Sequence, residues 1–200
     1  MICTKISELE DFMKANLKPS RYEHSLGVER MAVKLADIYG ADRDKAAFAG
    51  RYHDIAKCFD QDTMNGYAAE FGLPDIYYNN NALAHSKVAA CILERRFGVT
   101  DEDVLNAVRS HTTGRKGMSL LEEIVYVADA IEDNRNYPEL KELQDLAAED
   151  LDAACLEIMD FTIDTIQKKG RTLDKDTAEA REFIKDRISG TLSRGSDNKE

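Results

Sequence analysis

The chain has 200 residues, a length that suits one domain with a core of its own, and 43% of them are hydrophobic. Its 38 acidic residues outnumber 27 basic ones, giving a net charge of −11. This argues against a nucleic-acid or anionic-membrane surface, since either would need a basic face. No apolar run approaches transmembrane length, and the charged start is unlike a signal peptide. The four cysteines form no CxxC pair, so we expect reduced thiols and a cytoplasmic protein.

Apolar residues recur with helical spacing through most of the chain, which predicts an all-α fold in a single domain over residues 1–189. We expect helices, in chain order, from Ile6 to before Pro19, from an N-cap at Ser20 to Gly40, from an N-cap at Asp42 to about Cys58, and at about 61–71, 82–97, 101–111, 118–134, 139–168 and 175–189. The stretch 76–81 is typical of a loop. Residues 190–200 are polar and small, and we expect a disordered tail there.

Histidines and aspartates punctuate these helices in a pattern suited to metal binding. Imidazole and carboxylate are ligands of divalent cations, and helical bundles build such centres from inward-facing side chains. The candidate metal ligands are His24, His53, Asp54, His85, His111 and Asp129.

Each of these residues also has a simpler interpretation. His53-Asp54 is a short motif that arises by chance, and on its own it is equally compatible with a capping or surface pair. A lone His24 is more often a core histidine bonded to a backbone carbonyl. His85 and His111 lie near helix ends, where capping is common. Asp129 is the strongest candidate, because its neighbours are almost all apolar and no Lys or Arg lies one helical turn away.

Several residues near these ligands are suited to binding phosphate. Thr112, Thr113 and Gly114 follow His111 and could offer hydroxyl and backbone N–H donors, although a solvated turn is an equal alternative. Lys57 and Arg135 are cations close in sequence to Asp54 and Asp129, and both could reach a phosphate bound there.

The order H…HD…H…H…D resembles the HD-domain phosphohydrolase superfamily. The segments RYEHSLGV, HDIAK and HTTGRKGMSLLEEIVYVADAIEDNR are more specifically similar to the YqeK family of bacterial HD hydrolases, the symmetrical diadenosine tetraphosphatases. The resemblance runs from about Ser20 to Gly170 and is carried by long motifs rather than by the HD pair alone.

This resemblance implies an HD-type helical bundle around a buried centre of two iron ions, with manganese or another divalent metal as alternatives. It implies that His24, His53, Asp54 and Asp129 hold one ion, and that Asp54 bridges to a second ion held by His85 and His111.

The implied reaction is the hydrolysis of diadenosine tetraphosphate to two ADP, by attack of a metal-bound hydroxide on an inner phosphorus. The implied catalytic residues are Asp54, Lys57, His111 and Arg135. The implied substrate-binding residues are Lys57, His85, Thr112, Thr113, Gly114 and Arg135. Residues 77–81 are a candidate base pocket, with a surface loop as the alternative.

The implied partner is a small dinucleoside polyphosphate, with no nucleic acid and no membrane, and a dimer is one candidate assembly. Two other functions remain open. One is another HD activity, a nucleotide phosphomonoesterase or phosphodiesterase, and the other is a nucleotide sensor without turnover.

Overall fold

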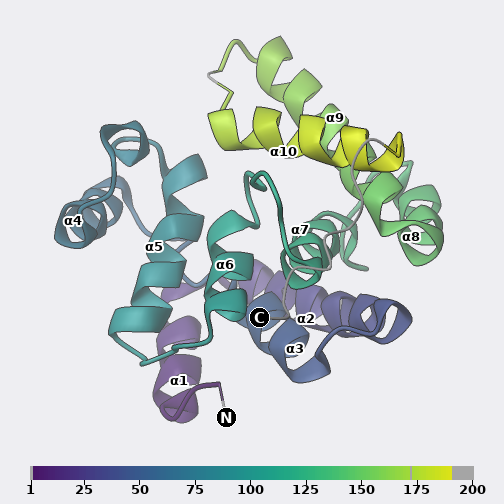
Figure 1. The fold of residues 1–200 in the computed structure, drawn as a ribbon. Helices are drawn as coiled ribbons and strands as arrows, with labels where there is room; N and C mark the ends of the chain where they lie inside the picture. Colours follow the sequence, from purple (N-terminus) through teal and green to yellow (C-terminus); the bar gives the residue numbers. More distant parts are fainter. Residues whose placement is uncertain (1, 172, 191–200) are drawn as a thin grey trace, which may run out of the picture.

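The computed structural model describes residues 2–171 and 173–190, and within these ranges the secondary structure is helical, without strands (Figure 1). The all-α prediction is therefore confirmed. The elements are α1 (Ile6–Asn16), α2 (Pro19–Tyr39), α3 (Arg43–Tyr52), α4 (Gln61–Phe71), the 3-10 turn η1 (Asp75–Tyr77), α5 (Asn81–Arg95), α6 (Glu102–Ser110), α7 (Leu120–Ile131), α8 (Leu140–Glu149), α9 (Leu151–Lys168) and α10 (Lys175–Ile188). The expected tail beyond Gly190 lies outside the described residues.

Short polar side chains begin several of these helices. The Asp42 carboxylate accepts hydrogen bonds from the backbone N–H groups of Asp44 and Lys45, which confirms the predicted cap of α3. Ser119 and Glu122 form a reciprocal capping box at the start of α7. Because the first N–H groups of a helix have no partner within the helix, such caps set where each helix starts.

Four of the predicted helices have boundaries that were wrong. Helix α2 begins at Pro19, not after Ser20, since proline at the first helical position needs no N–H partner. The third helix ends at Tyr52, and turns cover 53–58. The helix expected at 118–134 spans only 120–131, between the Ser119 cap and extended backbone at Glu132. The helix expected at 139–168 is two helices, because Asp150 leaves helical geometry and its side chain caps Ala153.

Helix α7 lies at the centre of the bundle and contacts α2, α3, α6, α8 and α9 (Figure 1). Most of its side chains are buried, including those of Ile124, Val125 and Val127. Helices α9 and α10 pack against each other and form a separate layer above α6 and α7 in Figure 1. This arrangement directs the inner faces of α2, α5, α6 and α7 toward one common region.

No helix within the described ranges combines the length and apolar character that crossing a membrane would require.

Candidate metal centre and adjoining cavity

The six predicted ligand residues come together at the middle of the bundle, although they come from five separate places in the chain. His24 belongs to α2 and Asp129 to α7, and the His53-Asp54 pair lies in the turn after α3. His85 belongs to α5, and His111 ends α6. All but Asp129 are buried, with exposed fractions of 7% or less.

Among the residues that the structure describes, two groups of three have side chains placed closely enough to hold a metal ion. His24, His53 and Asp129 form one group, and His53, Asp54 and His111 form the other. In each group one ligand atom from every residue lies within 4.8 Å of the others. His53 belongs to both groups, so the two sites adjoin.

Asp54 lies among three histidines, the two of its own group and His85. Its Oδ1 is 3.2 Å from Nε2 of His85 and 3.4 Å from Nε2 of His111, and its Oδ2 is 3.4 Å from Nε2 of His53. The two oxygens therefore face different rings, and one carboxylate can contact two neighbouring cations.

In their neutral form, three of the histidines present an unprotonated Nε2 to this centre. In each, the other ring nitrogen, Nδ1, lies against a backbone carbonyl, which can only accept a hydrogen bond. The pairs are His53 with Gly50 (2.7 Å), His85 with Asn81 (3.0 Å) and His111 with Val108 (2.8 Å). The proton is thus held on Nδ1, and the Nε2 lone pair is directed inward, as metal-binding histidines require.

Several inward-facing atoms lack a hydrogen-bond partner among the described residues. Three buried atoms have no hydrogen-bond partner within the described ranges, although other site residues lie close to them: Nε2 of His24, Nε2 of His53 and Oδ1 of Asp54. Nε2 of His85 and Nε2 of His111 also face each other at 3.1 Å. Buried lone pairs without donors are costly, and a divalent cation would satisfy them. The donor set therefore fits the metal that its chemistry implies.

The ionisation of these groups agrees with that fit. Burial lowers the pKa of His111 to about 4 and also lowers the pKa of His85, so both rings are neutral near pH 7, the form in which imidazole binds a metal. Burial acts to lower the pKa of His53 too, but the carboxylates of Asp54 and Asp129 outweigh it and raise that pKa. A positive charge is therefore favoured between the two carboxylates.

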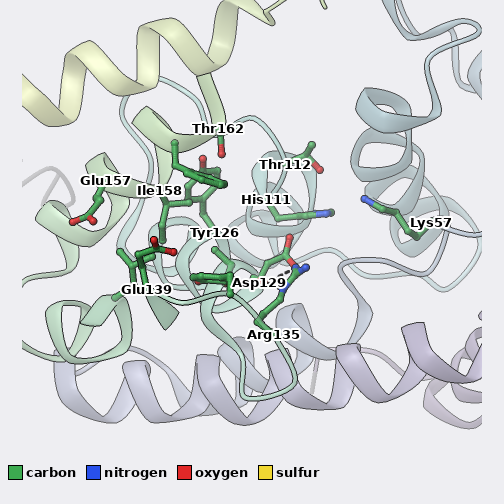
Figure 2. Close-up of a pocket in the computed structure, with 14 residues that line it drawn as sticks. Lys57, His111, Thr112, Tyr126, Asp129, Arg135, Glu139, Glu157, Ile158 and Thr162 are labelled. Carbon is green, nitrogen blue, oxygen red and sulfur yellow. Dashed lines mark hydrogen bonds and ion pairs between the residues drawn. The ribbon is translucent and has the colours of Figure 1, made fainter. Parts of the chain in front are cut away.

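Asp129 pairs directly with Arg135, the cation that the sequence pattern assigned to a bound phosphate. Nη2 of Arg135 is 2.6 Å from Oδ1 of Asp129, and the same guanidinium donates to the Asp129 carbonyl at 2.6 and 2.9 Å (Figure 2). Oδ1 also lies 2.9 Å from Nε2 of His24. Helical spacing alone does not predict this pair, because the chain leaves α7 at Ile131 and folds back to bring Arg135 to Asp129.

Glu132 and Arg21 are two site residues that sequence reasoning missed. Glu132 is 1% exposed, and its Oε1 lies 3.0 Å from Nδ1 of His24. Arg21 donates to Oδ2 of Asp54 at 2.9 Å. Both belong to the sequence motifs RYEHS and AIEDNR, and a glutamate directly after an apolar helix was the available signal.

A cavity of about 520 Å³ adjoins the ligand cluster, and Lys57, His111, Thr112, Asp129 and Arg135 line its inner end (Figure 2). Figure 2 shows the Lys57 side chain directed toward His111 and Asp129. The cavity therefore combines the ligand residues with two cations.

The neighbours of Thr112 do not face this cavity. The Thr112 hydroxyl lies 3.0 Å from Nε2 of His85, but Thr113 is buried and donates its hydroxyl to the Gly114 carbonyl. The N–H of Gly114 donates to the Ser110 carbonyl at 2.7 Å. Local hydrogen bonding thus occupies the donors of Thr113 and Gly114 that sequence reasoning directed to phosphate.

Comparison with known proteins gives consistent matches over most of the chain. The HD-domain family model matches residues 21–134. The symmetrical bis(5'-nucleosyl)-tetraphosphatase of Bacillus subtilis is 40% identical over 166 residues, which cover 82% of this chain and 89% of that protein. The protein of the same name from Staphylococcus aureus is 34% identical over 177 residues, covering 87% and 91%.

Two solved structures that resemble this chain are also HD-domain proteins. The crystal structure of an HD superfamily hydrolase from Clostridium acetobutylicum, described as involved in NAD metabolism, is 40% identical and covers 92% of this chain and 99% of its own. Its TM-score is 0.87. The HD domain of a Listeria monocytogenes phosphodiesterase, at 17% identity and a TM-score of 0.50, shares the fold alone.

Proposed function

Because the chain belongs to the HD-domain family, we propose that it is a metal-dependent hydrolase that cleaves diadenosine tetraphosphate symmetrically into two ADP. One observation carries this proposal: six ligand-type residues, several with inward lone pairs, adjoin a cavity that also contains Lys57 and Arg135. The substrate follows from the relatives named symmetrical bis(5'-nucleosyl)-tetraphosphatase, since the shared regions cover most of both chains.

We propose that the centre holds two divalent cations, with iron as the first choice and manganese as the alternative. The two adjoining ligand groups and the position of Asp54 between histidines support two ions. One ion would be held by His24, His53, Asp54 and Asp129, and the other by Asp54, His85 and His111. Mixed nitrogen and oxygen donors suit iron or manganese better than a closed structural zinc site.

The bound cations would supply a nucleophilic water at neutral pH and positive charge for the phosphate oxygens. The chain itself positions the substrate. Lys57 and Arg135 lie at the inner end of the cavity and bind the tetraphosphate, and Thr112 adds a hydroxyl donor. His85 borders the same end through its contacts with Lys57 and Thr112. The departing ADP is a stable anion, so these residues need not supply a strong general acid.

The proposal also covers the class of substrate, the extent of the catalytic unit, the assembly and the location of the protein. We propose a small nucleotide substrate and no nucleic acid, because the chain has 38 acidic against 27 basic residues. We propose a single catalytic unit over residues 1–189, a dimer as the candidate assembly, and a cytoplasmic location, for which the free thiols of all four cysteines are support.

Product analysis tests the activity directly. Protein loaded anaerobically with Fe(II), and separately with Mn(II), would be incubated with diadenosine tetraphosphate, and the products separated by ion-exchange chromatography. We expect ADP alone, and no product from an Asp54→Ala control that remains folded but has lost metal. AMP with ATP would contradict symmetrical cleavage. No turnover with either metal would favour another phosphate ester or a nucleotide sensor.

A further inference from the structure

The two ends of the cavity differ in chemistry. The inner end contains Lys57 and Arg135, beside the ligand cluster. The outer part includes Ile158 (Figure 2), and carbon-rich side chains such as those of Tyr137 and Leu143 also line the cavity. The total volume of about 520 Å³ lies within the range of roughly 300–1,000 Å³ that is usual for small-molecule sites. The space is thus larger than the phosphate end alone requires.

Two aromatic rings of the lining are available for contact with a flat ligand, and one of them, Phe161, lies one turn of α9 after Glu157 and Ile158 at the outer part (Figure 2). Phe161 is 71% exposed, the largest exposed fraction among the large hydrophobic residues described, and it lines the cavity. The Tyr137 hydroxyl donates to the Ala130 carbonyl at 2.9 Å, which holds its ring in the wall. Nucleobases stack on such rings regardless of base identity, since every base has a π-face.

Charge would orient an anionic ligand in the cavity. Glu139 and Glu157 lie at the outer part, away from Lys57 (Figure 2). Both side chains are exposed, and neither makes a hydrogen bond or ion pair with any residue that the structure describes. Two free carboxylates repel phosphate and accept hydrogen bonds from hydroxyl or amino groups. A ligand with phosphate at one end and hydroxyl or amino donors at the other therefore fits in one direction only.

We propose that the outer part of this cavity binds the nucleoside of one ADP half, with its base stacked on Phe161. This subsite rests on the proposed function and specifies how that function is achieved. Symmetrical cleavage requires that the centre of the tetraphosphate lies at the ligand cluster. A nucleoside held at a set distance to one side provides this register.

The alternative base site at residues 77–81 is less suitable. Asn79 accepts from Asn65 at 3.0 Å, and Asn81 accepts from Gln61 at 2.8 Å while donating to the Phe59 carbonyl at 3.1 Å. These amides thus join the segment to its neighbours. None of the residues in this segment lines the cavity.

In this proposal, metal binding and nucleoside binding belong to different parts of the chain. The ligand cluster lies wholly within residues 21–134, which the family model matches. Leu143, Glu157, Ile158 and Phe161 come from α8 and α9, beyond that match. The metal chemistry thus belongs to the family core, and nucleoside selection to the helices that follow it.

Equilibrium binding to the metal-loaded protein tests this proposal without turnover. Dissociation constants would be measured by calorimetry for ADP and for pyrophosphate, which has no nucleoside. We expect Phe161→Ala to weaken ADP binding about 5-fold or more, the loss typical of one base–aromatic stack, and to leave pyrophosphate binding unchanged. Phe161→Tyr keeps a ring and should bind ADP as the wild type does. Ile38→Ala, at a residue 45% exposed on α2, is the matched control.

Each other outcome has a definite meaning. The subsite is overturned if Phe161→Ala binds ADP as the wild type does, or if the wild type does not bind ADP. It is also overturned if Tyr78→Ala, in the alternative base site, is the only variant that binds ADP weakly. Equal weakening of ADP and pyrophosphate would also overturn it, because the substitution would then act on the phosphate end. If the wild type does not cleave diadenosine tetraphosphate but Phe161→Ala still binds ADP more weakly than the wild type, the proposed function is contradicted and the subsite is retained.

Discussion

His24 differs from the other histidines of the cluster in what supports its ring. His53, His85 and His111 each donate Nδ1–H to a backbone carbonyl, whereas His24 lies against the carboxylate of Glu132. A carboxylate partner makes the opposite ring nitrogen a stronger ligand than a carbonyl partner does. Glu132 is itself held by the N–H and side-chain amide of Asn134 at 2.8 and 3.0 Å.

Substitution of Glu132 should therefore weaken metal binding without unfolding the bundle. We expect Glu132→Gln to lower metal affinity about 10- to 100-fold, as is usual when the partner of a metal-binding histidine is lost. Competition with a chelator would measure this, and circular dichroism would check the fold. Glu149→Gln, at an exposed position on α8, is the control. Equal affinity in Glu132→Gln and wild type would show that Glu132 does not support the ligand.

Arg135 pairs with the candidate metal ligand Asp129 and also lines the cavity. An experiment can therefore distinguish a role in binding phosphate from a role in holding Asp129. If it binds phosphate, Arg135→Ala should weaken ADP binding about tenfold, the usual cost of a charge-assisted hydrogen bond, and leave the metal content unchanged. Elemental analysis and calorimetry measure the two quantities, with Arg30→Ala on the exposed face of α2 as the control. Parallel loss of metal would instead assign Arg135 to holding Asp129 in place.

At the scale of elements, the close approach of α2 and α3 determines where the HD pair lies. Gly50 is buried on α3, three residues before His53. A Cβ atom there would lie 3.0 Å from the Cα of Glu29 and 3.1 Å from the Val28 carbonyl oxygen. These are backbone atoms of α2 and cannot turn aside. The absence of a side chain at Gly50 thus lets the end of α3 bring His53 and Asp54 to His24.

Alanine at this position should be destabilising although alanine favours helices. We expect Gly50→Ala to lower the free energy of unfolding by roughly 1–2 kcal/mol, because overpacking costs more than helix propensity returns. Gly66→Ala in α4 is the matched control, since its Cβ would meet no atom within 4 Å. In Gly66→Ala the free energy of unfolding should rise by about 0.5–1 kcal/mol. Urea unfolding measures both variants, and a rise in stability in both would contradict the close packing at Gly50.

At the scale of the whole molecule, charged contacts join the N-terminal helix to the rest of the bundle. Glu10 of α1 accepts from Nε of Arg51 at 3.0 Å and from the Tyr22 hydroxyl at 2.7 Å. Arg51 also donates to Glu29 at 2.7 Å, so the network spans α1, α2 and α3. Partial burial acts to raise the pKa of Glu10, but the hydrogen bonds from Arg51 and Tyr22 outweigh it and lower that pKa to about 2.

This shift predicts how stability depends on pH. A carboxyl whose pKa falls on folding stabilises the protein above its unfolded pKa of 4.5, and the contribution is lost as the pH falls toward about 2. At pH 7 we expect Glu10→Gln to be less stable by about 1 kcal/mol, allowing for solvent screening. The difference should shrink below pH 4.5 in unfolding titrations. Glu70→Gln, at an exposed glutamate, is the control, and a difference that stays constant with pH would contradict the prediction.

The sequence alone determined the helical class, most helix positions and all six candidate ligands. Helical spacing and N-caps such as Asp42 are local properties, so they can be read without a fold. The wrong boundaries near 53–58 and at Asp150 also depend on local geometry, but there the apolar spacing continued across the break. Periodicity reports which face is apolar, and it does not report where the backbone leaves the helix.

Only the tertiary structure decided which side chains meet. Arg135 reaches Asp129 after the end of α7, Glu132 supports His24 from 108 positions away, and Phe161 joins the cavity from α9. Likewise, the donors of Thr113 and Gly114 are used by nearby backbone groups once the turn is folded. These contacts depend on helix packing, and packing depends on the summed fit of many side chains. The residue types thus determined which chemistry is available, and the packing of the helices determined where it is placed.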